Sequence, residues 1–156
     1  MIYYYDYTYK FCNLIIAEEN GRICNVSFKI KKNTEDWKKN ETPIIKKAAK
    51  QFNDYFNGKL KVFDLPLALH GTVFQLKIWN ALQVIPYGET RSYGQLAAMI
   101  ENPKASRAAG MANNRNPAAI IIPCHRIIGH DGSLTGYAGG LELKQQLLNL
   151  EKENSI

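Results

Sequence analysis

The stretch that decides the fold of the second half of the chain is residues 92–116, "SYGQLAAMIENPKASRAAGMANNRN". Its two ends, residues 92–100 and 105–116, read as short helices, and "ENPK" (101–104) breaks the pattern between them. The stretch therefore predicts two short helices across a short turn, which is the arrangement of a helix-turn-helix. Because this pattern is common, it is weak evidence of nucleic-acid binding by itself.

The second of these helices has an unusual composition. Small residues leave its surface nearly bare, and Arg107 and Arg115 stand among them. One interpretation is that the helix approaches a nucleic-acid backbone closely and inserts one long cation. The other is that small residues only permit tight helix–helix packing. The segment alone leaves both open. The small residues are Ala105, Ala108, Ala109, Gly110 and Ala112.

The residues before this stretch predict an α+β protein. Asn20-Gly21 lies between two strand-like runs and indicates a hairpin, and residues 43–56 carry apolar side chains at helical spacing. We expect a small N-terminal sheet-plus-helix domain over residues 1–66. A mostly helical C-terminal domain, residues 67–156, should follow and contain a winged helix-turn-helix-like unit. Its first helix is predicted over residues 72–82, with Thr72 available as the N-cap.

A second stretch, "IPCHRIIG" (122–129), places a thiol, an imidazole and a guanidinium in a row after the apolar run 118–122. Buried polar groups are costly unless they are paired, which favours a chemical role for all three. A cysteine is mostly protonated at neutral pH, and His125 could activate Cys124 as a base. On an extended segment the two side chains would point to opposite faces, so the chain must turn there or a water must bridge them. The alternative is that Cys124 is a small buried hydrophobe.

Charge, cysteines and hydropathy narrow the possible functions. The formal net charge is +6, but ten lysines fall between Lys29 and Lys61, and we interpret that segment as a solvated face rather than a nucleic-acid patch. The three cysteines lack CxxC spacing, which argues against a disulfide framework and a zinc ribbon. No apolar run is long enough for a membrane helix, and no signal peptide is evident, so a soluble, cytoplasmic protein is expected.

Three motifs in the C-terminal half together carry a resemblance to a known family. They are Asn116-Pro117, "PCHR" (123–126) and "GYAGGL" (136–141). They resemble the active-site signature of the O6-alkylguanine-DNA alkyltransferases, and residues 74–97 are similar to that family's approach to its helix-turn-helix. Over residues 1–60 the resemblance rests only on the α+β outline. It implies a DNA repair protein that moves an alkyl group from O6 of guanine onto its own cysteine, irreversibly and without a cofactor.

The resemblance also implies roles for single residues. Cys124 would be the acceptor nucleophile, His125 a base acting through one water, and Glu151 the carboxylate that orients His125. Asn116 would brace the turn that carries the thiol. Tyr137 would protonate or hydrogen-bond the departing guanine.

Two more positions complete the implied active site. Backbone groups of Cys124 and of the Ala138 region would read the edge of the base, and Arg126 would hold the active-site turn by hydrogen bonds. Ala138 stands where some members have serine, so a backbone N–H must replace any hydroxyl contact to O6. Ala119 stands where some members have proline beside the alkyl pocket. Some members also bind a structural zinc, but Cys12 and Cys24 lack a matching pair of histidines, and we predict no metal.

The implied partner is double-stranded DNA carrying O6-alkylguanine. Arg107 resembles the family's finger, which enters the duplex where the guanine has left, and Tyr93 would press on the phosphate of the target nucleotide. The second helix would lie in the minor groove, where there is room for little side-chain bulk. A monomer is expected. The residues of this helix expected to contact DNA are Arg107, Arg115, Ala108, Ala109 and Gly110.

Two alternative functions differ from this one in their chemistry. A non-catalytic protein of the same fold would only flag alkylated guanine, but such relatives replace the cysteine, and Cys124 is present. A Cys-His hydrolase of small acyl substrates would need an oxyanion hole, and it would leave the helix-turn-helix unexplained.

Overall fold

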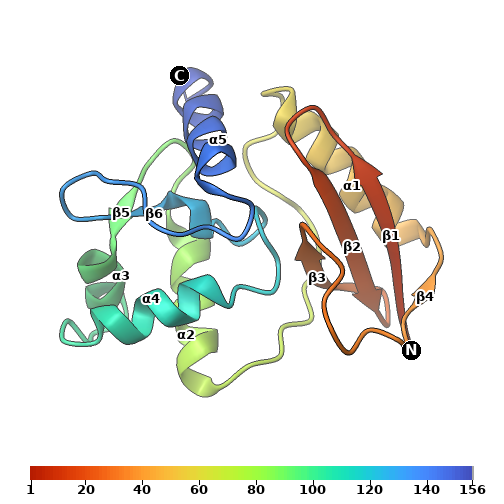
Figure 1. The fold of residues 1–156 in the computed structure, drawn as a ribbon, viewed down its shortest axis with the longest axis horizontal. Coiled ribbons are helices and arrows are strands. Elements are labelled where there is room, and N and C mark those ends of the chain that lie inside the picture. Colours follow the sequence, from red (N-terminus) through yellow and green to blue (C-terminus); the bar gives the residue numbers. More distant parts are fainter. Residues whose placement is uncertain (156) are drawn as a thin grey trace. The chain divides into compact units, whose positions relative to one another are not determined.

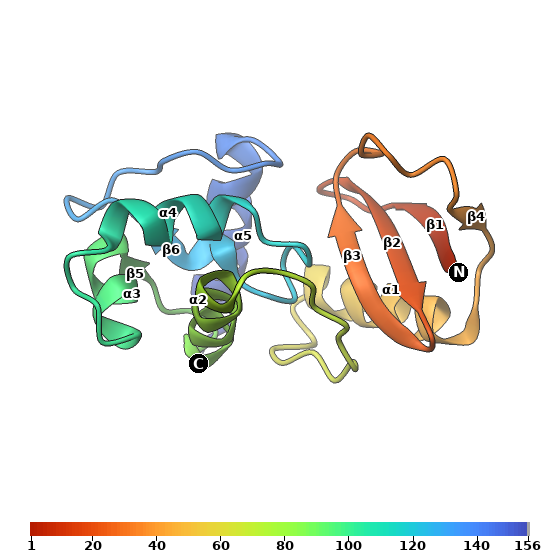
Figure 2. The ribbon, with the colours of Figure 1, turned by 90° about the horizontal axis from the view of Figure 1, so that it is seen from below.

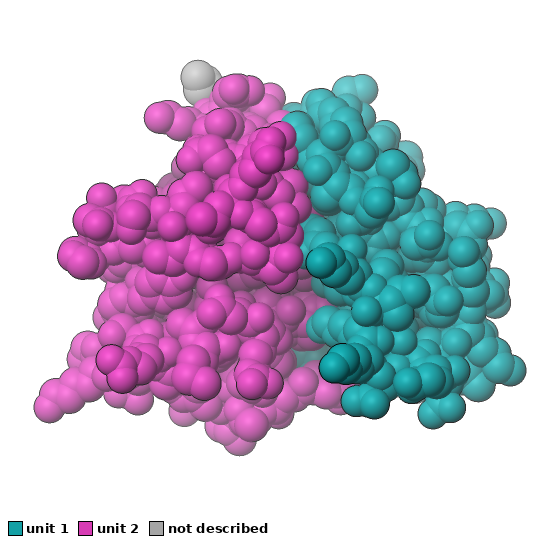
Figure 3. All heavy atoms as spheres, viewed as in Figure 1, with its two compact units in different colours: residues 1–69 teal, residues 70–156 magenta. Residues whose placement is uncertain are grey.

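A computed structural model describes residues 1–155 of the chain, which divide into two compact units. The first unit is Met1–Leu69 and the second begins at His70. Figure 3 colours the two units separately. Each unit contains its own secondary structure and its own buried core, so each is described by itself.

The first unit is a four-stranded sheet in the order β3-β2-β1-β4. The predicted hairpin is present: β2 and β3 are antiparallel, and Asn20 and Gly21 between them have φ angles of 52° and 77°. Positive φ at both positions is what a tight turn of this kind requires, and Asn-Gly tolerates it best. The strands are β1 (Ile2–Thr8), β2 (Asn13–Glu19), β3 (Arg22–Ser27) and β4 (Lys38–Lys39), the last parallel to β1.

A single long helix, α1 (Pro43–Phe56), packs on one face of this sheet (Figure 2). The spacing over residues 43–56 predicted this helix, and its apolar stripe is buried. The ring of Tyr9 lies 5.0 Å from that of Phe56 and 6.3 Å from that of Phe52, measured between centroids. Aromatic contacts between the turn that joins β1 to β2 and the helix therefore form much of this core. The buried residues of α1 are Ile45, Ala48, Phe52, Tyr55 and Phe56.

The second unit is mostly helical (Figure 1). Thr72 caps the first of its helices as predicted: its hydroxyl accepts from the Gln75 N–H, and the Gln75 side chain accepts from the Thr72 N–H. A short pair of parallel strands, β5 and β6, ties the two halves of the unit together. The elements are α2 (Val73–Val84), β5 (Arg91–Ser92), α3 (Tyr93–Met99), α4 (Ser106–Asn114), the 3₁₀ turn η1 (Cys124–Arg126), β6 (Ile127–Ile128) and α5 (Leu141–Glu153).

The two helices predicted from residues 92–116 form as α3 and α4. Ser92 and Gln95 make a second capping box at the start of α3. Glu101, with a φ of 60°, reverses the chain between the helices. The indole N–H of Trp79 on α2 donates to the Ala112 carbonyl at 3.0 Å, which fixes α4 against α2. The α+β class with a helix-turn-helix in the second unit is thus confirmed. None of the helices among residues 1–155 is both long and apolar enough to cross a membrane.

Candidate active site

The apolar run before the thiol forms a tight turn, although its composition suggests a strand. Ile120 has a φ of 73°, and the Ile122 N–H donates to the Ala118 carbonyl at 2.9 Å. The Asn116 side chain clamps this turn from both ends. Its Nδ2 donates to the Ile122 carbonyl at 2.6 Å, and its Oδ1 accepts from the Ala118 N–H at 2.9 Å. A left-handed β-branched residue is strained, so these bonds are needed to hold the turn.

Cys124, His125 and Arg126 follow this turn as one turn of 3₁₀-helix, η1. Of the two alternatives left open for this segment, the structure shows the first: the chain turns at the thiol. Successive side chains of a 3₁₀ turn point about 120° apart. His125 consequently points away from Cys124 into the unit, where it is fully buried, while Cys124 keeps 8% of its surface exposed.

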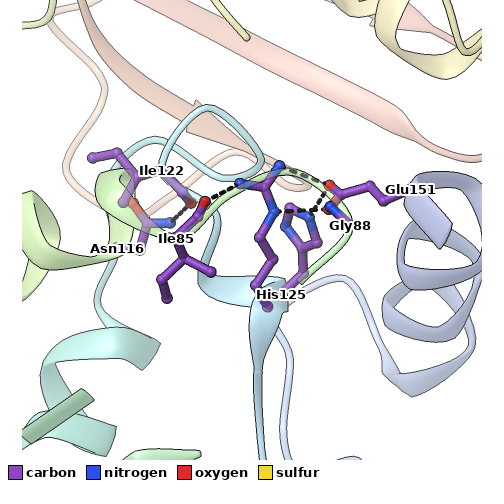
Figure 4. Close-up of polar contacts among 7 residues, drawn as sticks. Ile85, Gly88, Asn116, Ile122, His125 and Glu151 are labelled. Atoms are coloured by element: carbon purple, nitrogen blue, oxygen red, sulfur yellow. Dashed lines mark hydrogen bonds and ion pairs between the residues drawn. The ribbon is translucent and has the colours of Figure 1, made fainter. Parts of the chain in front are cut away.

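Glu151 on α5 joins the two residues that follow the thiol. One carboxylate oxygen, Oε2, lies 2.6 Å from His125 Nε2 and 3.0 Å from Arg126 Nη2, and the other, Oε1, accepts from Arg126 Nε at 2.7 Å (Figure 4). The Gly88 N–H also donates to Oε1, at 3.2 Å. Arg126 donates a further bond from Nη1 to the Ile85 carbonyl at 2.7 Å. One carboxylate thus fixes both the imidazole and the guanidinium.

The electrostatics of this cluster keep the imidazole neutral. Burial lowers the pKa of His125, and the positive charges of Arg126 and Lys144 lower it further, while Glu151 only partly opposes this. Burial alone would raise the pKa of Glu151, but the hydrogen bonds from His125 and Arg126 and the positive charge of Arg126 outweigh it and hold that pKa well below its ordinary value. A neutral His125 that faces a carboxylate through Nε2 carries its proton there. Nδ1 is then the basic nitrogen.

The thiol itself is protonated at rest. Burial raises the pKa of Cys124, and the Asn116 side chain and the Lys144 charge oppose that rise. A buried thiol of this kind needs a base to become a nucleophile. Burial also raises the pKa of Cys12 and of Cys24, each to about 11, and neither has a basic or cationic neighbour that lowers it. Of the three cysteines, Cys124 is the one whose thiolate is favoured by both a side-chain hydrogen bond and a cation.

Lys144 is a functional candidate that the sequence reasoning missed. Its side chain is fully buried, and its ammonium donates to the Thr135 carbonyl at 3.0 Å. Burial lowers the pKa of Lys144, and the nearby Cys124 opposes that change. The signal in the sequence was position: Lys144 precedes Glu151 by seven residues on one helix, so both occupy the same face. A lysine on the buried stripe of an amphipathic helix is rare unless it is paired.

Tyr137 and Ala138 lie on the loop between β6 and α5. Tyr137 is half-buried, and its ring meets that of His125 edge-on, with 6.5 Å between centroids. Ala138 is exposed. Among residues 1–155 no group of three histidine, cysteine, aspartate or glutamate side chains is placed to hold a metal ion.

Comparisons with known proteins cover both units. Residues 73–153 match the family model described as "6-O-methylguanine DNA methyltransferase, DNA binding domain", and residues 2–69 match its "ribonuclease-like domain". The chain belongs to the 6-O-methylguanine DNA methyltransferase family. The family named from the active-site motifs is therefore confirmed.

Individual members of the family are similar over nearly the whole chain. The methylated-DNA–protein-cysteine methyltransferase of Methanosarcina acetivorans is 54% identical over 88% of this chain and 90% of its own length. The constitutive enzyme of Bacillus subtilis is 49% identical, over 89% of this chain and 88% of its own. The crystal structure of Mycobacterium tuberculosis OGT in complex with DNA is 44% identical and has a TM-score of 0.91, covering 97% of this chain and 94% of that one.

In this family member the small residues of α4 serve two different faces. Ala109 and Ala112 are buried, with 0% and 3% of their surface exposed, and pack inside the unit. The expectation that Ala109 contacts DNA is wrong for this reason. Gly110 lies against the Tyr93 ring, where an added Cβ would come within 3.2 Å. The outer face of α4 presents Arg107, Ala108, Met111, Asn114 and Arg115.

Proposed function

We propose that this protein repairs alkylated DNA by moving an alkyl group from O6 of guanine in double-stranded DNA to the Sγ of Cys124. A bond forms between Sγ and the alkyl carbon, the bond between that carbon and O6 breaks, and the electron pair leaves with the guanine. The observation that carries the proposal is a single buried cysteine next to a histidine held by a carboxylate, in a chain of the methylguanine methyltransferase family.

Activation of the thiol follows from the geometry of η1. His125 Nδ1 accepts the Cys124 proton through one water, because the two side chains point apart along the 3₁₀ turn. Glu151 stabilises the imidazolium that forms, and Arg126 keeps the carboxylate ionised and in place. Lys144 stabilises the developing thiolate, because its buried positive charge lowers the pKa of Cys124. Tyr137 donates its hydroxyl hydrogen to the departing guanine.

Access to Cys124 requires that the base leave the duplex. Cys124 keeps only 8% of its surface exposed, so a guanine stacked in a helix cannot reach its thiol. The outer face of α4 lies in the minor groove, and Arg107 fills the space that the guanine vacates. Tyr93 presses on the target phosphate, Arg115 contacts the backbone, and backbone groups near Ala138 read the base edge.

The transfer ends the activity of the molecule. A thioether at Cys124 has no leaving group, and the other two thiols have raised pKa values and lie in the first unit. Each molecule therefore acts once. It acts as a monomer, and in the cytoplasm, where thiols stay reduced. A non-catalytic role in lesion binding has no support in the site, because the thiol and its partners are all present.

The test is alkyl transfer to the purified full chain. A duplex containing one O6-methylguanine is mixed with a slight excess of protein, and the intact mass is measured. We expect a gain of one methylene, mapped by peptide analysis to the peptide that contains Cys124. Cys124→Ser should bind the same duplex and gain no mass. Transfer by Cys124→Ser, or an unmodified wild type, would refute the proposed function.

A further inference from the structure

Thr135 lies on the loop between β6 and α5 and is bonded on two sides. Its hydroxyl shares a hydrogen bond with the hydroxyl of Tyr93, the first residue of α3. Its carbonyl accepts the ammonium of Lys144 at 3.0 Å. One loop residue therefore joins the helix-turn-helix to the buried cation near the thiol.

The bond to Lys144 is needed to place that cation. A fully buried ammonium is unfavourable unless its N–H groups are paired, and the Thr135 carbonyl supplies a partner. Lys144 has a long side chain with four rotatable bonds, so the position of this carbonyl decides where its charge sits. Because Cys124 and Lys144 interact through their charges, a displaced carbonyl would change the stabilisation of the thiolate.

The bond to Tyr93 holds the same loop residue from the other side. The Tyr93 ring packs against Gly110 of α4, which leaves little freedom for its hydroxyl. The neighbouring loop residues Asp131 and Ser133 bond to each other and to Gly129, within the loop. The Tyr93 hydroxyl is thus a direct side-chain contact between Thr135 and the helix-turn-helix.

The Tyr93–Thr135 pair is accessible from outside. Both residues line an open groove of about 480 Å³, together with Ser106 at the start of α4 and residues of the loop.

We propose that Thr135 is a positioning residue that couples Tyr93 on the helix-turn-helix to Lys144 beside the reactive thiol. This inference rests on the proposed alkyl transfer to Cys124. The Thr135 hydroxyl fixes the loop, the Thr135 carbonyl fixes Lys144, and the thiolate is stabilised in full only when both bonds are made.

Free O6-benzylguanine isolates this coupling, because it has no phosphate for Tyr93 to contact. The rate of benzyl transfer is measured for the wild type, Thr135→Val, Tyr93→Phe and the double variant. Each single change removes one hydroxyl of the same bond and should slow transfer about fivefold, and the double variant should also be about fivefold slower. Thr135→Ser keeps the hydroxyl and should react at close to the wild-type rate.

The outcomes separate the coupling from the proposed function. Wild-type rates in both single variants, or a double variant slower by the product of the single effects, would overturn the coupling while transfer to Cys124 still stands. A wild type that takes no benzyl group would instead refute the proposed function. Melting temperatures show which variants are folded. If Thr135→Val does not fold, Tyr93→Phe decides alone: a slower benzyl transfer supports the coupling, and an unchanged rate overturns it.

Discussion

The Nε2 atom of His125 lies 2.6 Å from Oε2 of Glu151, and both side chains are buried within the second unit. The same carboxylate accepts two bonds from Arg126. Glu151 therefore has two tasks in the folded unit: it orients the imidazole and it neutralises a buried guanidinium. Removal of the carboxylate should lower the rate of alkyl transfer through His125 and the free energy of unfolding through Arg126.

The first prediction concerns Glu151→Gln. The amide keeps the shape of the carboxylate, but it leaves Arg126 as an unpaired buried charge and no longer stabilises a protonated His125. We expect a loss of about 3–5 kcal/mol in the free energy of unfolding. Methyl transfer should slow by about a hundredfold or more, because His125 is a weaker base without a carboxylate to stabilise its protonated form. Urea unfolding and single-turnover transfer rates measure the two effects.

Glu153→Gln is the matched control for this change, since Glu153 is exposed two residues further along α5. It should leave both quantities within the error of the wild type. If Glu151→Gln transfers methyl at the rate of Glu153→Gln, Glu151 does not support the base.

The pH dependence of the reaction gives a second prediction. Because the pKa of His125 is lowered from 6.5, the imidazole stays neutral and basic at pH values where a free histidine is half protonated. Transfer from O6-benzylguanine should therefore keep its full rate down to about pH 6.5 and fall only below it. A midpoint of the acid limb above 6.5 would contradict a neutral buried base.

The same pKa shifts determine how stability changes with pH. The folded-state pKa values of His125 and Glu151 both lie below their ordinary values of 6.5 and 4.5, so protons bind more tightly to the unfolded chain. Each group contributes its full share to the free energy of unfolding at pH values above its ordinary pKa. It should decrease as the pH falls below about 6.5, because of His125, and decrease further below about 4.5, because of Glu151. Urea unfolding at a series of pH values measures both steps.

How far the sequence predicts this site depends on the kind of contact. Short-range patterns predicted local structure well: Thr72 caps α2, and Asn20-Gly21 turns the hairpin. The apolar run 118–122 was misleading, because composition cannot show that Asn116 folds it into a turn with Ile120 at positive φ. That turn and η1 decide where the thiol points.

Long-range pairing was harder to predict from the residues alone. A sequence separation of 26 positions between His125 and Glu151 does not indicate that the two meet, and the family resemblance suggested the pair. Lys144 was missed because its partner is a backbone carbonyl, that of Thr135, and backbone partners leave no residue-type signal. Ala109 was misassigned because small residues can serve either the inner or the outer face of a helix.

A further prediction concerns Arg107 on the exposed face of α4. Arg107→Ala should slow repair of O6-methylguanine in duplex DNA by about tenfold to a hundredfold, because nothing then fills the space of the extruded base. Reaction with free O6-benzylguanine should change less than twofold, since a free base has no stack to leave. Rates on the two substrates, measured under single-turnover conditions, give the comparison.

Two further variants make this comparison specific. Lys77→Ala removes an exposed cation from α2 and should leave both rates unchanged. Tyr137→Phe should slow both reactions, because guanine needs a proton in each. Equal losses on both substrates for Arg107→Ala would exclude it from base extrusion.

The last prediction is that each molecule reacts once and is destabilised by its product. Cys124 has only 8% of its surface exposed and is enclosed by the turn that Asn116 clamps, so an added methyl group has little room. Overpacking of this kind costs about 1–3 kcal/mol, and the alkylated protein should melt several degrees below the free form. Titrating methylated duplex against a fixed amount of protein should give a plateau of one methyl per protein molecule. Melting curves of the free and the alkylated protein measure the change in stability. A plateau well above one would overturn single turnover, whereas an unchanged melting temperature would show that the turn adjusts to the added group.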